Sequence, residues 1–315
     1  MSEPTTQSSS GFLSEARIEK LRLFKRNTFH IASQFRKSLG GMIGLIILVI
    51  FVAMALLAPW IATKYHTASM PANDPHWNIY NPSYAEPSGK YWFGTDWYGR
   101  DVFTLTVWGS RASLVVGFLA SFISIVLGTT IGLAAGYFGK ISDEILMRIT
   151  DFFLVIPWFP LMIVIASLMG RSFINIIIVI GITSWPSTAR IVRSQVLSLK
   201  EKTFVERAVA VGAGSGRIIS RHILPNVFPL IFANTILLIA NSIFSESFLD
   251  FFGLGPTDII SWGLVLEWAY EYGAFSTFAW WNIFFPGGCI VVLIMAFYLI
   301  GDALDEVLNP KLRRR

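Results

Sequence analysis

Long apolar runs separated by short polar stretches dominate the sequence from residue 39 onwards. Each run is close to the ~20 residues that an α-helix needs to cross ~30 Å of hydrocarbon. The six predicted spans are Leu39–Ile61, Ala112–Phe138, Phe152–Gly170, Ser172–Ala189, Ile223–Ser245 and Phe284–Ile300. The pattern therefore predicts an all-α integral membrane protein with six transmembrane helices.

The fourth predicted span contains a helix breaker in its middle, at Trp185–Pro186. Proline lacks a backbone N–H and disfavours helical geometry at the residue before it. Irregular backbone at membrane depth is tolerated where it lines a cavity. We therefore expect a tilted or broken helix facing a cavity in this span.

Basic residues are unevenly distributed between the connecting segments. Most of the 25 Lys and Arg fall on one side if the spans alternate, whereas acidic residues divide nearly evenly. The positive-inside rule then places the N- and C-termini in the cytoplasm, together with the loop at 199–226. Residues 1–38 become a cytoplasmic tail with an amphipathic helix on the inner leaflet, 301–315 a cytoplasmic tail, and 62–111 a small extracytoplasmic segment.

Composition supports this class and excludes others. The chain is 54% hydrophobic and only 14% charged, whereas soluble domains average about 25% charged residues. The net charge of +5 does not indicate a nucleic-acid partner, because the basic residues are spread along the inner side and form no single face. The single cysteine, Cys289, excludes an intrachain disulfide framework.

Motifs for chemistry of the chain's own are absent from the sequence. It has no GxxxxGK[ST] phosphate loop and no HExxH metal motif. The Gly-rich run 211–216 follows a predicted helix and lacks the strand that a dinucleotide-binding turn requires. We therefore expect a protein that is not an enzyme and that has no catalytic residues, metal site or bound cofactor.

A polar island at 203–226 interrupts the apolar runs. Apolar residues from Phe204 to Val211 recur at helical spacing, and three glycines, Gly212, Gly214 and Gly216, follow them. Glycine takes the positive φ that a sharp turn needs. A second short helix is predicted from Arg217 to Ile223, ending against Pro225. The island is predicted to be two short helices joined by a glycine elbow; an ordinary basic loop is the alternative.

The spacing of Glu206, Ala208, Gly212 and Pro225 resembles the EAA loop of ABC-transporter permeases. The sequence RHILPN at 221–226 is similar to the peptide-permease version of that loop. Arg207 departs from the general pattern, which has alanine there, and His222 suits the peptide branch. The resemblance implies that the loop docks on an ATP-hydrolysing subunit. The residues to which it assigns this role are Phe204, Glu206, Arg207, Ala208, Gly212, Gly214, Gly216, Arg217, Arg221, His222, Leu224 and Pro225.

Further motifs resemble the second permease of oligopeptide and dipeptide importers. In residues 93–111, GTD–GRD resembles the signature before that subfamily's second span, and FGLG, SWG, FPG, GDAL and NPKLR follow in order at 252–313. By residue type alone, Asp96 and Asp101 are suited to a tight turn and a helix cap. A metal or catalytic site is the alternative, and Arg100 between the two acids argues against it.

The resemblance also implies a set of partners in the cell membrane. These are a second permease subunit forming a heterodimer, two ABC ATPase subunits that carry ATP and Mg, and an extracytoplasmic substrate-binding protein. The implied cargo is di- and oligopeptides; oligosaccharides or nickel are the alternatives. A stand-alone channel or a membrane enzyme is the alternative outside this class.

Several residues inside the spans are candidates for packing or for a polar path. Gly128, Gly132 and Gly136 share one helix face and predict close helix packing, with a flexible hinge as the alternative. Arg148 and Asp151 are spaced to pair on one face. Polar residues at membrane depth are functional candidates. The candidates for the translocation pathway are Ser184, Ser187, Asn234, Asn241 and Ser242; the two asparagines are alternatively bridges between helices.

Two predicted outside segments are rich in Trp and Tyr, residues that favour the membrane interface. One, 66–108, is also rich in proline and is predicted to be a small structure on the membrane surface. The other, 245–281, is predicted to contain a short surface helix near Gly263 to Tyr272.

Overall fold

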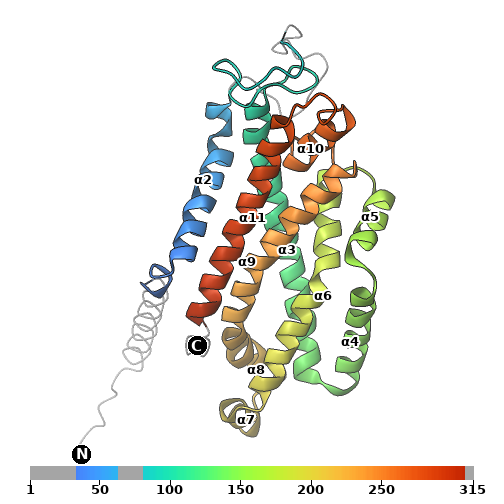
Figure 1. Ribbon diagram of the computed structural model, residues 1–315. Coiled ribbons are helices and arrows are strands. Elements are labelled where there is room, and N and C mark those ends of the chain that lie inside the picture. The colour runs from blue at the N-terminus through green and yellow to red at the C-terminus, as the bar shows by residue number, and fades with distance from the viewer. Residues whose placement is uncertain (1–32, 63–80, 309–315) are drawn as a thin grey trace, which may run out of the picture.

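The computed structural model describes residues 33–62 and 81–308. Nearly all of the predicted amphipathic helix of the N-terminal tail, residues 309–315 of the C-terminal tail and residues 63–80 of the first outside segment lie outside these ranges. The described residues form a bundle of long helices, with short helices at its two ends (Figure 1).

Within the described residues, five helices are long and apolar enough to cross a membrane. They are α2 (Leu39–Ile61), α3 (Val102–Phe138), α6 (Phe173–Lys200), α9 (Leu224–Phe251) and α11 (Trp281–Leu308). The remaining predicted span, Phe152–Gly170, is divided between α4 (Lys140–Val155) and α5 (Trp158–Met169), which meet at 92°. The all-α membrane fold is thus confirmed, but the third predicted span, Phe152–Gly170, falls in a bent pair of helices and not in one straight helix.

The helices extend beyond the predicted apolar spans. Helix α3 begins at Val102 rather than Ala112, because the side chain of Asp101 caps it by accepting the N–H of Thr104. The predicted cap is confirmed. Helices α9 and α11 likewise continue past the predicted ends at Ser245 and Ile300. Predicting spans from hydrophobicity underestimates such helices, because backbone hydrogen bonding does not stop where the apolar run does.

The predicted break at Trp185–Pro186 is wrong, since α6 runs unbroken through Pro186. The break lies instead at Ile156–Pro157, where Ile156 has the extended backbone favoured before proline. Packing explains the difference. Helix α6 is pressed against α3 along much of its length, whereas Thr150 is the only buried residue of α4. Little therefore resists the bend at Pro157, and much resists one at Pro186.

The glycine stripe of α3 makes the contact with α6. A Cβ at Gly128 would lie 2.6 Å from the Thr188 Cβ, and one at Gly132 would lie 2.6 Å from the Ala189 carbonyl. Gly136 meets Val196 in the same way. The predicted close packing of this face is confirmed.

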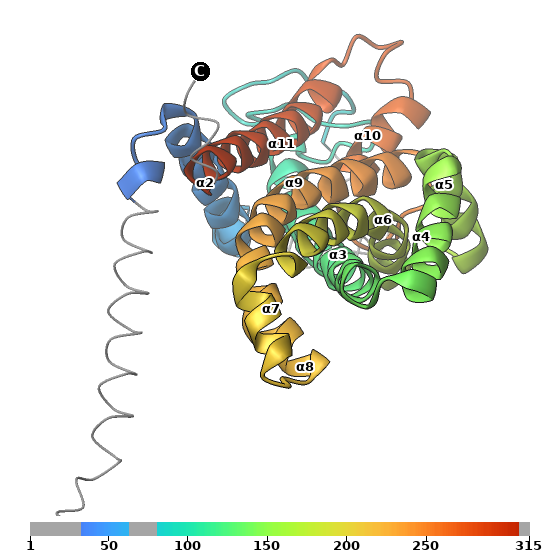
Figure 2. The same ribbon diagram turned by 90° about the horizontal axis from the view of Figure 1, so that it is seen from below.

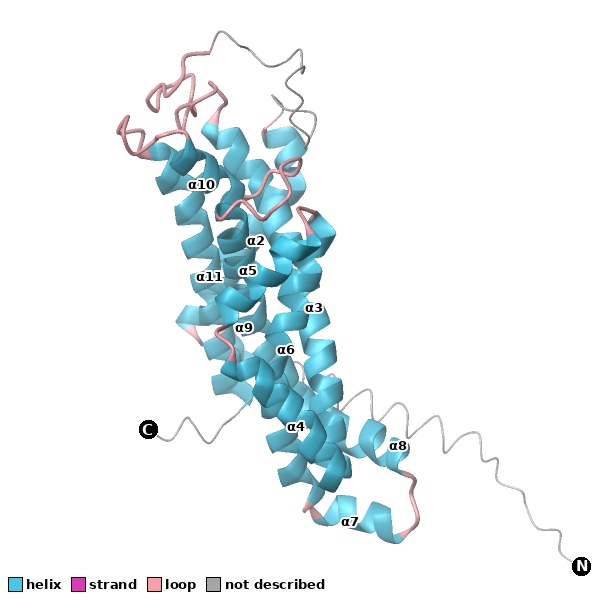
Figure 3. Cartoon of the chain, turned by 90° about the vertical axis from the view of Figure 1, so that its right-hand side faces the viewer, coloured by secondary structure: helices cyan, strands magenta, loops and turns pink. Residues whose placement is uncertain are grey.

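Two regions mark opposite ends of the bundle. The 203–226 segment, with α7 (Thr203–Ala210) and α8 (Ser215–Ile218), lies at one end (Figures 1 and 3). At the other end, residues 81–101 cover α10 (Trp262–Glu271) and the start of α11. We call residues 81–101, α10 and the first turn of α11 the aromatic cluster. The predicted short helix near 263–272 is confirmed as α10, although Trp262, Leu264 and Val265 bury it in the bundle.

Candidate functional site

The 203–226 segment connects α6 to α9 and extends beyond the outline of the bundle when seen from its own end (Figure 2). Helix α7 ends at Ala210, and Gly212, which follows the capping residue Val211, has φ +77°. The N–H of Ala213 bonds the Ala208 carbonyl (3.0 Å) and the N–H of Gly212 bonds the Val209 carbonyl (2.9 Å). This pair of bonds defines a Schellman motif. The predicted elbow is therefore present, and Gly212 is its left-handed residue.

The other two glycines of the elbow have ordinary backbone roles. Gly214 has φ −66° and precedes α8, and its carbonyl accepts the N–H groups of Arg217 and Ile218. Gly216 lies inside α8, and no atom lies within 4 Å of a Cβ built at either position. Neither glycine is required by a close approach within this chain.

The second short helix does not end at Pro225 as predicted. Helix α8 passes through a π-helical turn, η1 (Ile219–Ile223), directly into α9, whose first turn contains Pro225. The N–H of Leu224 bonds the Ile219 carbonyl, five residues back. Proline is tolerated in the first turn of a helix because its missing N–H has no partner to lose there. The π-turn joins the 203–226 segment rigidly to α9.

The apolar residues of this segment divide between two directions. Val205, Ala208, Ile218 and Ile223 are buried in a cluster with Val196 and Leu199 of α6. Phe204, Val209 and Val211 are instead exposed by 38%, 57% and 83%. The buried set fixes the segment to α6 and α9, and the exposed set leaves an apolar surface at its tip.

Charged side chains of the same segment are exposed as well. Glu206, Arg207, Arg217 and Arg221 are all exposed. The rings of Phe204 and His222 lie 6.4 Å apart, and His222 and Leu224 are half-buried, whereas Pro225 is exposed. An apolar centre with a charged rim has the composition of a protein-docking surface.

A cleft of about 330 Å³, lined by both apolar and polar side chains, opens where α4 and α5 bend. Its wall includes Pro157 and Trp158 from the bend, Ser184 and Ser187 from α6, and Asn241 from α9. The Asn241 carboxamide oxygen accepts the Tyr298 hydroxyl at 3.3 Å. Three of the five predicted pathway residues are thus brought together. The cleft is next to Pro186, as expected, but the break that shapes it is at Pro157, a helix breaker that we did not use.

Asn234 and Ser242 do not line this cleft. The Asn234 amide donates to the Thr188 hydroxyl of α6 (2.9 Å), so Asn234 bridges two helices. Ser242 is 1% exposed and faces the interior of the bundle.

Ion pairs link α4 to α6 beside the cleft. Asp151 pairs with Arg190 at 2.5 Å, not with Arg148 as its spacing predicted, and Asp143 accepts two bonds from Arg193. Sequence spacing finds partners on the same helix only, whereas Arg190 and Arg193 reach the acids of α4 from the neighbouring helix α6.

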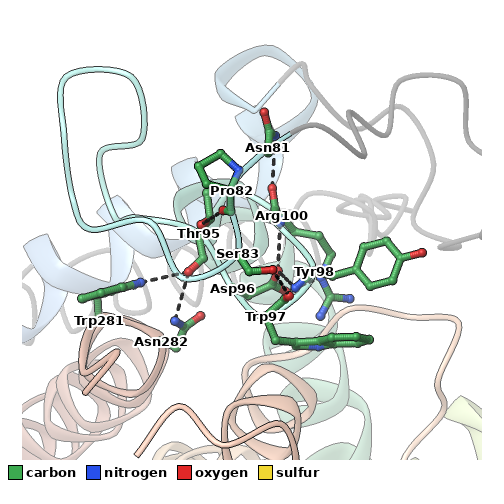
Figure 4. Close-up of polar contacts among 11 residues, drawn as sticks. Asn81, Pro82, Ser83, Thr95, Asp96, Trp97, Tyr98, Arg100, Trp281 and Asn282 are labelled. Carbon is green, nitrogen blue, oxygen red and sulfur yellow. Dashed lines mark hydrogen bonds and ion pairs between the residues drawn. The ribbon is translucent and has the colours of Figure 1, made fainter. Parts of the chain in front are cut away.

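The aromatic cluster is held together by backbone and side-chain hydrogen bonds (Figure 4). The Thr95 carbonyl accepts Trp281 Nε1 (3.0 Å) and Asn282 Nδ2 (3.2 Å), which fixes residues 81–101 to α11. Asp96 accepts the backbone N–H groups of Tyr98 and Arg100 and pairs with the Arg100 guanidinium. The structural role predicted for GTD–GRD is confirmed.

Aromatic rings complete this region. The Arg100 guanidinium lies 3.9 Å from the Trp268 ring centroid, and Trp97 stacks on Tyr272 at 3.8 Å. The Tyr84 hydroxyl donates to the Tyr272 carbonyl (2.5 Å), and burial followed by the charge of Asp96 raises the pKa of Tyr84. Within residues 33–62 and 81–308, no three His, Cys, Asp or Glu residues converge as metal ligands.

Two buried acids, Glu246 and Asp250 on α9, were not singled out from the sequence. Acidic residues inside an otherwise apolar run were the available signal.

Sequence comparison places these features in a known context. The family described as binding-protein-dependent transport system inner membrane component matches residues 128–314, which include the 203–226 segment and the cleft. A second family, the N-terminal TM domain of oligopeptide transport permease C, matches residues 22–86.

Curated relatives align over most of the chain. The dipeptide transport system permease protein DppC of Alkalihalophilus pseudofirmus is 37% identical, over 89% of this chain and 88% of that protein. The oligopeptide transport system permease protein OppC of Bacillus subtilis is 35% identical, over 89% and 88%. The OppC of Haemophilus influenzae is 34% identical, over 98% and 97%.

Among solved structures, the chain resembles one from an inward-facing conformation of the MetNI methionine ABC transporter. The TM-score is 0.51 at 20% identity, over 65% of this chain and 95% of that chain. At this identity the likeness concerns the fold.

Proposed function

Because the chain belongs to the family of binding-protein-dependent transport system inner membrane components, we propose that it imports di- and oligopeptides across the cell membrane. It acts as one permease subunit of an ABC importer. The observation that supports this cargo is that relatives 34–37% identical over 89–98% of the chain are dipeptide and oligopeptide transport permeases. Its partners are a second permease, two ATPase subunits and an extracytoplasmic substrate-binding protein.

The 203–226 segment faces the cytoplasm in this proposal. The distribution of basic residues supports that orientation. The start of α2 and the end of α11 lie at the same end of the bundle as α7, which agrees with both termini being cytoplasmic (Figure 1). The aromatic cluster then faces the binding protein.

Docking on an ATPase uses the apolar tip formed by Phe204, Val209 and Val211. Covering exposed apolar side chains of this size with a partner removes them from water, which stabilises the complex. Arg207, Arg217 and Arg221 at the rim contribute steering more than affinity. ATP and Mg are bound by the partner, and this chain contributes no nucleotide site.

The buried residues of the same segment transmit its movement to the membrane-spanning helices. Val205 and Ile218 pack with Val196 and Leu199, and η1 continues into α9. A displacement of α7 is therefore a displacement of α6 and α9. These two helices carry Ser184, Ser187 and Asn241, the polar residues of the cleft, which we assign to the translocation pathway. Asn234 contributes by holding α9 to α6 through its hydrogen bond to Thr188.

Reconstitution tests the cargo. The chain, its partner permease, the ATPases and the binding protein are placed in liposomes, and ATP-dependent uptake of labelled peptides, oligosaccharides and Ni²⁺ is measured in parallel. Uptake of peptides alone is expected. Uptake of sugar or nickel without peptide would contradict the proposed cargo and leave the importer assignment intact.

A glycine pair tests the docking role. Gly212 and Gly273 both have positive φ, each follows a helix in a Schellman motif, and no atom lies within 4 Å of a Cβ at either position. Gly212→Leu is expected to let ATP hydrolysis continue while uptake falls, with the complex still expressed. Gly273→Leu introduces the same kind of backbone strain outside the 203–226 segment and serves as the matched control. Equal loss of coupling in both variants would refute a specific role for the segment.

A further inference from the structure

Two carboxyl groups lie side by side in the interior between α3, α9 and α10. Glu246 and Asp250 are one helical turn apart on α9 and are 1% and 2% exposed. Their side chains are within hydrogen-bonding reach of one another. In the described part of the chain, neither forms an ion pair with a basic residue.

Hydroxyl groups supply donors to three of the four carboxyl oxygens. Ser113 of α3 donates to Glu246 Oε1 and Oε2, each at 3.1 Å, and Ser247 also donates to Oε2 at 3.1 Å. Ser261, which caps α10, donates to Asp250 Oδ2. The fourth oxygen, Asp250 Oδ1, is buried and has no hydrogen-bond donor among the described residues. One more hydrogen atom, placed at Asp250 Oδ1, would give every carboxyl oxygen of the pair a hydrogen-bond partner.

Other charged groups do not neutralise the pair. On α10, Glu267 is the nearest further acid; burial raises its pKa, and the charge of Arg171 opposes that rise. On α3, the Arg111 guanidinium lies over the Trp108 ring, 5.1 Å from its centroid. Asp258 and Glu271 are exposed, and α6 contributes the apolar Phe173 and Ile176.

A metal ion does not fit in this place. The space lined by Glu246, Asp250 and Ser261 has no room for a water molecule, and no third acid, histidine or cysteine among the described residues joins the pair as a metal ligand. Two carboxylates this close in an apolar interior cannot both keep their charge without a counter-ion. A proton needs no space of its own, and it supplies the donor that Asp250 Oδ1 lacks.

We propose that Glu246 and Asp250 bind one proton between them, and that this shared proton fastens the 253–264 stretch to α3 and α9. The pair then carries one negative charge, which the three serine hydroxyls stabilise. Residues 253–264 pack so closely against Glu246 and Asp250 that two glycines of this stretch have no room for a side chain. A Cβ at Gly255 would lie 2.0 Å from Asp250 Oδ1, and one at Gly263 would lie 2.5 Å from the Ser247 carbonyl.

Infrared spectroscopy of the full chain in lipid nanodiscs detects the proton directly. The C=O stretch of a protonated carboxyl is separate from the carboxylate bands. Difference spectra are recorded at neutral pH for wild type against Glu246→Gln and against Asp250→Asn. In either variant an amide N–H replaces the proton as donor, so the remaining carboxyl ionises. We expect the same protonated-carboxyl band to be lost in both variants, and to be kept in the control Glu267→Gln.

Two results would overturn the proposal. Absence of the band from the wild-type chain means that both groups are ionised. Loss of the band in only one variant means that a single carboxyl holds the proton unshared.

The melting temperature gives a second test that does not depend on the assignment of infrared bands. From about pH 6 to about pH 9 the wild type is expected to lose stability relative to Glu246→Gln, because only the wild type must keep a proton that alkaline solvent removes. Parallel pH profiles would contradict the proposal.

Discussion

The two ends of the molecule use the same elements for opposite purposes. The aromatic cluster and the 203–226 segment each consist of tight turns, short helices and positive-φ glycines. In the aromatic cluster, the chain supplies hydrogen-bond partners for the Asp96 carboxylate and the Trp281 indole and stacks Trp97 on Tyr272. In the 203–226 segment, charged and apolar side chains are left exposed. The first region is stabilised by contacts within this chain, and the second is the surface for which we propose a docked partner.

Two glycines make the contrast measurable. Gly94 and Gly212 have φ values of +73° and +77°. A Cβ at Gly94 would lie 2.6 Å from both the Ala85 carbonyl and Trp281 Nε1, whereas nothing lies within 4 Å of one at Gly212. Both positions have a left-handed backbone that favours glycine, but only Gly94 lacks room for a side chain.

The largest effect is expected for Asp96→Ala. The substitution removes the acceptor of two backbone N–H groups and the counter-charge of the buried Arg100. Breaking a buried pair in this way costs about 3–5 kcal/mol. Thermal unfolding of the purified chain measures this loss. Asp258→Ala, an exposed acid at the same end, is expected to have no effect, and a comparable loss there would remove the distinction.

Gly94→Ala is expected to rank second. Left-handed geometry for a residue with a Cβ costs about 1–2 kcal/mol, and overpacking against Trp281 adds about 1–3 kcal/mol. The same unfolding measurement applies, and a crosslink between residues 81–101 and α11 would report their separation. A melting temperature equal to that of wild type would show that Ala85 and Trp281 move aside at little cost in stability.

Gly212→Ala is expected to cost only the left-handed backbone energy, about 1–2 kcal/mol. Gly214→Ala provides the control within the same elbow, because φ is −66° there and the surroundings are open. It is expected to leave the melting temperature unchanged. If Gly212→Ala destabilises the chain as much as Gly94→Ala, packing does not distinguish the two ends.

The sequence predicted what depends on local pattern and failed where distant contacts decide. Hydrophobic runs located the spans, Asp101 located the start of α3, and Gly212 located the elbow. Pro157 and Pro186 give equal local signals, yet only Pro157 breaks its helix, because α3 holds α6 straight. Asp151 pairs with Arg190, which lies on another helix. Proline and charge patterns predict what a segment prefers, and packing decides whether it follows that preference.

The smallest effect on stability, and the most informative one, is expected for Val211→Ser. Val211 is 83% exposed at the tip of the 203–226 segment, so its replacement should change the free energy of unfolding by less than about 0.5 kcal/mol. Val155 is 82% exposed at the end of α4, and Val155→Ser is the matched control. Co-purification of the ATPase subunits is expected to fall for Val211→Ser and to persist for Val155→Ser. Equal co-purification would mean that the tip lies outside the docked surface. Loss of folded protein with Val211→Ser would mean that the exposed tip contributes to the chain's own stability, as the aromatic cluster does.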